Sequence, residues 1–488
     1  MGGLDELQHI APVVALLAGA ALVLVADLVS NRRTDVQWLA LLAVVVATFM
    51  ACWQVLSGIT GESALGGAVV VDVFSLYFTF LLLAVAAAVV IVSSDGLQRV
   101  EQQGEFYALL LTSTASMVLL AQAQELITIF VALETTSIVQ FVLAGIARDD
   151  RSSEAGLKYL LTGAISAAVL LYGFAFLFGL SGTTSLAGIA EFVGAGSEGT
   201  RLALVLAFVL VAAGIGFKMA IVPFHAWAPD VYQGSPTPVT TFLSVASKAA
   251  GFAVVLRIFY TGLGGGDTFV SEDWAKMFGV FAALSMTFGN IAAIQQTDVK
   301  RLLGYSSIAQ AGNIAIGLAA VAGGSTLGPS AVLFFLGTYA ATNLGVFIAV
   351  IAVSKSIGSD DLRDYAGLLK RSPGTALVLS LCLLSLTGIP PTAGFLAKVY
   401  VFNSAVQTGE EWLVWLIIVA VLNTAISAYY YLRWARVMIL DEPRETVAFR
   451  PSLATNGLLM LAGGGVLFLG VVPTPLIEAA RRAAETLV

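Results

Sequence analysis

Long apolar stretches, separated by short polar segments, follow one another along the whole chain. Each stretch has about 18 residues or more, enough for a helix to cross roughly 30 Å of hydrocarbon. A membrane-spanning barrel would show short segments of alternating polarity instead. The pattern therefore predicts an all-α polytopic membrane protein.

Hydropathy and turn signals predict about fourteen transmembrane spans. They lie at residues 8–29, 36–57, 73–94, 105–122, 124–147, 156–180, 201–232, 239–263, 274–296, 300–322, 328–355, 374–404, 411–438 and 453–474. Composition agrees with this, because 58% of the residues are hydrophobic and 11% are charged, unlike a soluble domain. Asp5 and Glu6 precede the first span and no small-residue cleavage site follows it, so we expect an uncleaved span rather than a signal peptide.

Basic residues are concentrated in the loops that follow odd-numbered spans. They are Arg32, Arg33, Arg99, Arg148, Arg151, Lys300, Arg301, Lys355, Arg363, Lys370, Arg371, Arg433, Arg436, Arg444 and Arg450. The loops after even-numbered spans hold only Arg201 and Lys276, and the C-terminal Arg481 and Arg482 are the exception. Cytoplasmic loops carry the excess of lysine and arginine, so we expect both termini on the outer side.

Two spans are unusually long and are interrupted by prolines, with 222-VPFHAWAPDVY-232 in the seventh and 389-IPPTAGFLAKVY-400 in the twelfth. Five spans separate them, and an odd number turns a repeated unit upside down in the membrane. The expected organisation is a three-helix segment 1–104, a first five-helix repeat 105–263, a second, inverted five-helix repeat 274–438, and a C-terminal segment 439–488 containing the last span.

Five charged residues fall well inside predicted spans: Glu134, Lys218, Lys248, Arg257 and Lys398. Each unpaired charge near the bilayer centre costs about 2.5 to 3.5 kcal/mol on insertion scales, so such groups pair inward or line hydrated cavities. For Arg257, near the end of its span, snorkelling or packing is the favoured interpretation. For the others, structural ion pairs remain the alternative to a functional role.

Lysine suits proton transfer, because a desolvated lysine can release its proton near neutral pH whereas a guanidinium effectively cannot. A nearby carboxylate stabilises the protonated form, so Glu134 and Lys218 would form a tunable pair. Pro223, and Pro390 with Pro391, leave helix carbonyls free within the membrane, where they can order water or simply kink the helix. In 300-KRLLGYSSIAQAGN-313, polar residues recur at helical spacing and indicate either interhelical hydrogen bonds or a water-lined path.

The two cysteines, Cys52 and Cys382, lie alone in separate apolar spans, and the two histidines, His9 and His225, are far apart. These spacings exclude disulfide, iron–sulfur, zinc and paired-haem sites. We therefore expect this chain to carry no redox cofactor and no metal.

Three segments, 214-GIGFKMAIVPFHAWAPDVYQGSPTPVTTFLSVASKAAGF-252, 300-KRLLGYSSIAQAGN-313 and 386-LTGIPPTAGFLAKVYVF-402, closely resemble subunit N of bacterial NADH-quinone oxidoreductase, respiratory complex I. The resemblance covers essentially the whole chain. It implies a proton-translocating subunit of the membrane arm in the bacterial cytoplasmic membrane, driven by quinone reduction elsewhere in the complex. NADH, FMN, the iron–sulfur clusters and quinone would then bind partner subunits, and the neighbours would be other membrane-arm subunits, including antiporter-like ones.

The resemblance also implies roles for individual residues. Glu134 and Lys218 match the family's Glu/Lys pair, Lys248 its central lysine, and Lys398 the terminal lysine of the second broken span. His225, in the PFHAW motif, and Lys158, at the start of the sixth span, match two further family positions. One departure is clear, since Gln310 and Asn313 stand where the family often has the histidine and tyrosine of SSIxHxGY.

Two alternatives to the complex I assignment are a subunit of a separate multi-subunit cation/proton antiporter and a structural spacer of the membrane arm. Purification in mild detergent distinguishes the first, because NADH-oxidising partners accompany a complex I subunit and do not accompany a separate antiporter. Neutral substitutions distinguish the second, since in a spacer they would impair assembly and leave pumping per assembled complex unchanged.

Overall fold

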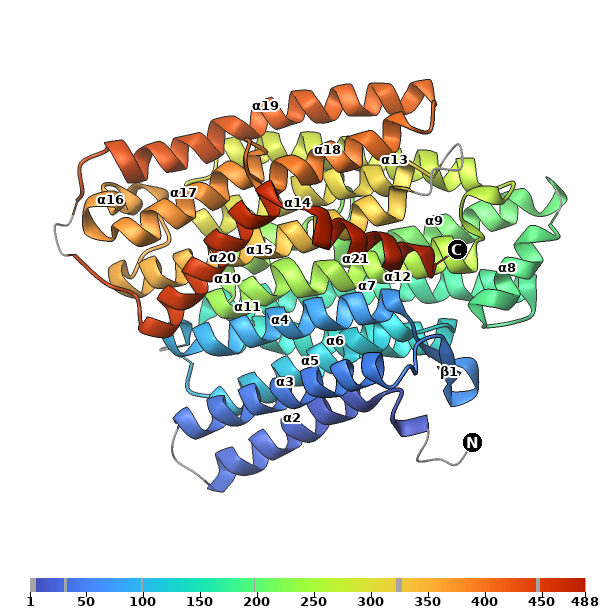
Figure 1. The fold of residues 1–488 in the computed structure, drawn as a ribbon, viewed down its shortest axis with the longest axis horizontal. Coiled ribbons are helices and arrows are strands. Elements are labelled where there is room, and N and C mark those ends of the chain that lie inside the picture. The colour runs from blue at the N-terminus through green and yellow to red at the C-terminus, as the bar shows by residue number, and fades with distance from the viewer. Residues whose placement is uncertain are drawn as a thin grey trace.

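The chain folds into a bundle of long helices whose axes share one general direction (Figure 1). The computed structural model describes residues 6–29, 33–97, 100–196, 198–321, 327–444 and 448–487. The predicted basic loop residues Arg32 and Arg99 lie outside the described residues, as does the start of the N-terminal segment. Helices therefore dominate, as the apolar pattern predicts.

The first eight predicted spans each coincide with a helix or a helix pair. They are α2 Ala11–Val29, α3 Arg33–Leu56, α4 Val73–Gly96, α5 Gln103–Gln122, α6 Leu126–Ala144, α7 Asp150–Ser181, the broken pair α9 Arg201–Met219 and α10 Trp227–Gly234, and a continuous run made of α11 Thr237–Phe242, η3 Leu243–Ser247, α12 Lys248–Leu256 and η4 Arg257–Gly262. Both η3 and η4 are π-helical turns.

The other six predicted spans also coincide with a helix or a helix pair. They are α13 Ser271–Ile294, α14 Val299–Ala319, α15 Leu327–Ile357, the broken pair α17 Pro373–Thr387 and α18 Ala393–Val406, α19 Glu411–Leu440, and α20 Leu453–Val471. Shorter elements are α8 Leu186–Gly194, α16 Leu368–Arg371, α21 Thr474–Glu485, and the 3-10 turns η1 Leu65–Gly67, η2 Glu198–Thr200, η5 Gly265–Asp267 and η6 Leu362–Tyr365.

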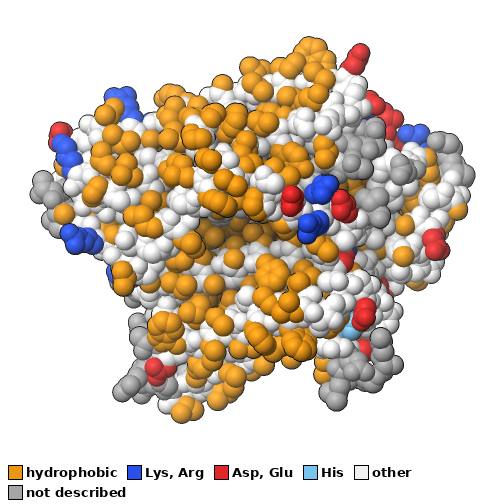
Figure 2. Space-filling view, viewed as in Figure 1, with side chains coloured by type: hydrophobic (Ala, Val, Ile, Leu, Met, Phe, Trp, Pro, Cys, Tyr) orange, Lys and Arg blue, Asp and Glu red, His pale blue; other side chains and the backbone are white. Residues whose placement is uncertain are grey.

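Twelve helical segments in the described part of the chain are long and apolar enough to cross a membrane. Polar α14 is not among the twelve, and α17 and α18 are two shorter apolar helices. The polytopic fold is confirmed, whereas the count of fourteen spans stays a prediction. Large apolar side chains such as Leu28, Leu202 and Leu461 are exposed, and Figure 2 shows hydrophobic side chains over most of one face.

Several short elements were not predicted from the hydropathy pattern. Strands β1 Glu62–Ala64 and β2 Val69–Val71 pair antiparallel in a loop of the helical fold. Strands of three residues are too short for their period to be recognised. The C-terminal α21 buries Ala480, Ala483 and Ala484 and exposes charged side chains. The charged side chains of α21 form a separate group on the apolar face shown in Figure 2. Because of these charges, the hydropathy of this segment is too low for it to be predicted as a span.

Both broken helices end in the same backbone structure. Ala220 follows α9 with φ 56°, and the N–H of Ile221 donates to the carbonyl of Gly216 at 3.1 Å. Gly388 follows α17 with φ 91°, and the N–H of Ile389 donates to the carbonyl of Leu384 at 3.1 Å. A left-handed residue with this longer-range bond is a Schellman cap, which stops a helix abruptly.

The run from Thr237 to Gly262 is the innermost helix, since its most apolar 18-residue window is entirely buried. Near its end, Arg257 is 1% exposed and donates from both terminal nitrogens to Asp72 at 2.7 Å. The guanidinium also bonds the carbonyl of Ala121 and lies 4.5 Å from the Phe74 ring centre. Arg257 therefore packs in the interior rather than snorkelling, and it ties the start of α4 to the core.

We expect Asp72→Ala to destabilise the protein by about 3 to 5 kcal/mol, because it leaves a buried guanidinium without its counter-charge. Asp273→Ala is the matched control, since it removes the 3.0 Å partner of the more exposed Arg201 and should cost under about 1 kcal/mol. Thermal unfolding of the purified protein in detergent measures both. Equal losses would contradict a special role for the buried pair.

Candidate functional site

Lys218 lies one residue before the end of α9 and is held by a glutamine. It is 3% exposed, and its Nζ donates to Oε1 of Gln140 on α6 at 2.9 Å. The same ammonium lies 5.9 Å from the centre of the Tyr159 ring on α7. A buried cation is thus satisfied by a neutral acceptor and an aromatic face.

Glu134, the predicted partner of Lys218, lies on the same α6 helix. Its charge interacts with that of Lys218, but the only hydrogen bond that Lys218 Nζ makes to a side chain, within the described ranges, goes to Gln140. Glu134 is half-buried, and its helix neighbours Val131 and Ile138 are exposed. The carboxylate therefore lies at an apolar outer face of the chain, separated from the lysine.

Lys248 begins α12, directly after the π-helical η3. It is 2% exposed, and its Nζ donates to the carbonyls of Met219 and Ser307, both at 2.9 Å. Met219 is the residue after Lys218, so the end of α9 brings the two lysines together. Ser307 lies on α14, and through it the Lys248 ammonium links the first broken helix to the second half of the chain.

Two carbonyls at each break accept hydrogen bonds from side chains. In the first break, the carbonyl of Met219 accepts from Lys248 and that of Phe217 accepts from the Trp227 indole at 2.9 Å. In the second break, the carbonyl of Thr387 accepts from Lys398 at 2.9 Å, and that of Leu386 accepts from Gln310 at 2.8 Å. In each break one acceptor therefore bonds a lysine and the other a neutral side chain.

Lys398 lies in the first half of α18 and is 5% exposed. Besides the Thr387 carbonyl, its Nζ bonds Oγ1 of Thr424 on α19 at 3.1 Å. A small cavity of about 10 Å³ between Lys398 and Gln310 is lined by polar Thr342 and Ser385 and by apolar Phe335 and Leu386. A cavity of this size has room for about one water molecule.

The polar residues of α14 make interhelical hydrogen bonds. Ser306 lies 2.5 Å from the Tyr431 hydroxyl, and Ser307 Oγ lies 3.1 Å from the Tyr232 hydroxyl. Gln310 accepts from Asn313 at 3.1 Å while its own Nε2 bonds the end of α17. This row therefore joins the surroundings of Lys248 to the second break, with Gln310 as a neutral donor in the middle.

His225 and Lys158 lie apart from this line. His225 packs edge-on against Phe288, with ring centres 4.5 Å apart, and its Nδ1 has no hydrogen-bond partner among the described residues. Lys158 has a 45% exposed side chain and pairs with Glu154 at 2.8 Å and Asp230 at 2.7 Å. The structure therefore brings Lys218 and Lys248 together at the end of α9, links Lys248 to the break beside Lys398 through the polar row of α14, and leaves His225 and Lys158 at the side.

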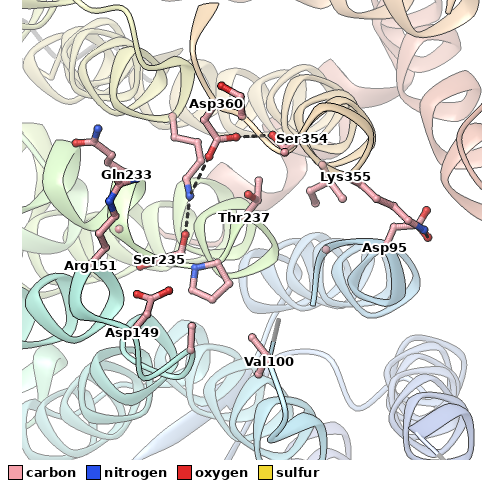
Figure 3. Close-up of a pocket in the computed structure, with 18 residues that line it drawn as sticks. Asp95, Val100, Asp149, Arg151, Gln233, Ser235, Thr237, Ser354, Lys355 and Asp360 are labelled. Atoms are coloured by element: carbon pink, nitrogen blue, oxygen red, sulfur yellow. Dashed lines mark hydrogen bonds and ion pairs between the residues drawn. The ribbon is translucent and has the colours of Figure 1, made fainter. Parts of the chain in front are cut away.

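A polar cavity of about 270 Å³ opens where α4 and α15 end and α7 and α14 begin, which we call the basic end. Figure 3 shows the pair Asp95 and Lys355, 2.8 Å apart, on one side and Arg151 on the other. Lys300 is 5% exposed, donates to the Ser235 carbonyl at 2.7 Å and lies 3.8 Å from Asp360. The cavity is therefore lined by charged side chains, of which Lys300 is buried.

Asp298 lies just outside this cavity, immediately before α14. Burial raises the pKa of its carboxyl above the usual range, and the hydrogen bond from the Arg301 backbone N–H offsets only part of that rise. The same carboxylate accepts from Gln233 at 3.1 Å. The N-terminal end of α14 therefore holds a buried carboxyl group, that of Asp298, and a buried lysine, Lys300.

Sequence reasoning missed Gln140, Tyr159, Tyr431 and the buried state of Lys300. A lone glutamine within an apolar span is the one signal that pointed to Gln140, because amides are rare there. The tyrosines carried no signal, since aromatic residues are common in membrane helices. Lys300 was counted as a loop charge because its burial depends on α10 and α15.

The breaks and the buried lysines define an antiporter-like membrane subunit. The family model described as "NADH:quinone oxidoreductase/Mrp antiporter, TM" matches residues 123–426. NADH-quinone oxidoreductase subunit N of Dehalococcoides mccartyi is 41% identical, over 98% of this chain and 99% of the relative. The subunit N of an Anaeromyxobacter species is 39% identical, over 96% and 94%. The chain therefore belongs to the subunit N family of NADH-quinone oxidoreductase, a proton-translocating complex.

Solved structures agree. A chain of respiratory complex I from Thermus thermophilus with bound aureothin is 33% identical, with a TM-score of 0.79 over 96% of this chain and 98% of that one. A chain of the archaeal membrane-bound sulfane sulfur reductase shares the fold at 24% identity, with a TM-score of 0.88 over 98% and 97%. This chain is accordingly a multi-pass subunit of the membrane arm.

Gly388→Ala should disturb Lys398. A Cβ at this position would meet the Lys398 Cδ at 3.0 Å, on a backbone with φ 91°. We expect a backbone cost of about 1 kcal/mol and displacement of the ammonium from the Thr387 carbonyl, with reduced proton translocation by the assembled complex.

Gly58→Ala is the matched control, because Gly58 has φ 74° and no atom lies within 4 Å of the place that its added methyl group would take. It carries the same backbone cost without touching a lysine, so translocation should be unchanged. Identical behaviour of the two variants in a proton-pumping assay would show that the Lys398 contact is unimportant.

Proposed function

We propose that this subunit transfers protons along Glu134, Lys218, Lys248 and Lys398, coupled to quinone reduction elsewhere in the complex. The observation that carries the proposal is the pair of contacts of Lys248, which bonds the end of the first broken helix and the α14 helix that leads to the second. Buried charges are rare in membrane proteins and mark ion or proton pathways.

Each step has a physical basis in the residues nearby. Glu134 lies close enough to Lys218 to interact through its charge, so a change at the outer face alters the stability of the protonated lysine. Lys248 and Lys218 share the last turn of α9. Between Lys248 and Lys398 the row on α14 holds neutral donors, so water in the small cavity beside Gln310 would complete the transfer.

The cavity at the basic end is the proposed cytoplasmic access. The excess of lysine and arginine in the loops of this end favours a cytoplasmic orientation, which puts both termini outside, in a bacterial cytoplasmic membrane. Lys300 and Asp360 would meet the entering proton. Lys300 lies at the start of α14, and Ser307, two turns further along the same helix, bonds Lys248. The division into two inverted five-helix repeats, 105–263 and 274–438, is part of the same proposal.

Redox cofactors belong to the partner subunits in this scheme. Among the described residues, no group of three or more histidine, cysteine, aspartate or glutamate side chains could hold a metal. NADH, FMN, iron–sulfur clusters and quinone would bind elsewhere, and the energy would arrive through neighbouring membrane-arm subunits. Half-buried Glu134, on an apolar face, is suitably placed to receive it.

Lys218→Met and Lys248→Met should each lower proton pumping about a hundredfold or more, the scale of losing a positioned proton-transfer group. Methionine is close to lysine in length and lacks the charge. The measurement is pumping linked to NADH oxidation in vesicles containing the assembled complex.

Lys276→Met is the control, because Lys276 is exposed and pairs only with Glu272 on its own helix in the part of the chain that is described. It should pump normally. Undiminished pumping by both interior variants would refute the proposed path, and a loss confined to assembly would favour a structural spacer.

A further inference from the structure

The side chain of Gln140, on α6, forms hydrogen bonds with side chains from four other helices. Its Oε1 accepts from Lys218 on α9 at 2.9 Å, from Ser247 on η3 at 2.9 Å and from Tyr159 on α7 at 3.1 Å. All four side chains are at most 3% exposed. Among the described residues, Gln140 is the side chain to which the Lys218 ammonium donates.

The orientation of the amide is determined by its neighbours. Nε2 faces Ser113 Oγ at 3.2 Å and the sulfur of Met117 at 3.9 Å. Turning the amide over would point its N–H₂ group at the Lys218 ammonium, which has donors and no acceptor. The carbonyl oxygen therefore faces the three donors.

Three donors converge on an oxygen with two lone pairs. If Lys218 leaves, Tyr159 and Ser247 still satisfy both of them. Departure of the lysine therefore leaves no buried acceptor without a partner, which is a state that destabilises a protein interior. The acceptor can hold the lysine and release it without that penalty.

Glu134 competes for the same ammonium from six residues earlier on α6. A carboxylate binds an ammonium more strongly than a neutral amide does, but Lys218 is bonded to the amide. Tyr159 stacks on Trp227, with ring centres 4.3 Å apart, and Trp227 bonds the Phe217 carbonyl at the break. Motion of the broken helix would therefore reach the Gln140 oxygen through Tyr159.

We propose that Gln140 is a positioning residue for proton transfer, the neutral acceptor that holds the Lys218 ammonium away from Glu134. The inference rests on the proposed function, because it gives Lys218 two alternative partners on one helix. Gln140 itself exchanges no proton. It sets which partner Lys218 occupies, and its neighbour Ser247 directly precedes Lys248.

Two substitutions of Gln140 test this with opposite expected structures. Gln140→Met keeps the length and removes the carbonyl, so Lys218 should move onto Glu134. Gln140→Glu has the same shape and adds a charge, so Lys218 should stay on residue 140. Cryo-electron microscopy of the assembled complex would show the position of the Lys218 side chain. Both variants should pump protons about tenfold more slowly, which is the scale of one hydrogen bond to a charged group.

Thr136→Val is the matched control. Thr136 is buried on the same helix, 1% exposed, and its hydroxyl bonds only the Ala132 carbonyl of its own helix, within the described part of the chain. This variant removes one buried hydrogen bond of α6 without touching Lys218. Normal pumping and an unmoved Lys218 are expected.

Lys218→Met, measured in parallel, separates the two proposals. Slow pumping by Lys218→Met with native pumping by both Gln140 variants would overturn the positioning role and leave the proton path intact. Native pumping by Lys218→Met would overturn both. If Gln140→Met fails to assemble, the isosteric Gln140→Glu decides the matter, and a Lys218 side chain bonded to Glu134 in that variant would refute the inference.

Discussion

Within hydrocarbon, every backbone carbonyl has to find its hydrogen bond inside the protein, and the functional part of this chain is organised by that constraint. The helices break at α9–α10 and α17–α18, and each break sets free carbonyls in the interior. Lys248 and Lys398 each bond one carbonyl of a break, while Trp227 and Gln310 bond another carbonyl of the same breaks. Buried ammonium groups and broken helices therefore stabilise one another.

The same constraint explains the position of α12, which lies within the innermost run Thr237–Gly262. Lys248 begins an α-helical segment of nine residues between two π-helical turns, and Arg257 begins the second of these turns. Its guanidinium is bonded to Asp72 and to the Ala121 carbonyl, so this end of the helix is attached to α4 and α5. With one end attached, the other end has a defined place for its lysine beside Met219.

The sequence predicts much of the fold because apolar length is a property of the chain itself. Each predicted span has a helix or helix pair, and Lys218, Lys248 and Lys398 stood out as charges in apolar surroundings. Partners were harder to predict, since they depend on packing: Gln140 bonds Lys218, where Glu134 was expected to be in contact, and Arg257 bonds Asp72 far away in sequence. The β1–β2 hairpin and α21 are too short and too polar, respectively, for a hydropathy pattern.

Gln310 has a consequence for how the two halves communicate. The amide group of a glutamine does not titrate, so it keeps its N–H donor at every pH. Its hydrogen bond to the Leu386 carbonyl is therefore independent of pH. A histidine there could carry a charge through the middle of the molecule, and glutamine does not. Gln310 therefore holds α14 to the end of α17 at every pH, and in the proposed path a proton passes between Lys248 and Lys398 by way of water, without a change in the charge of residue 310.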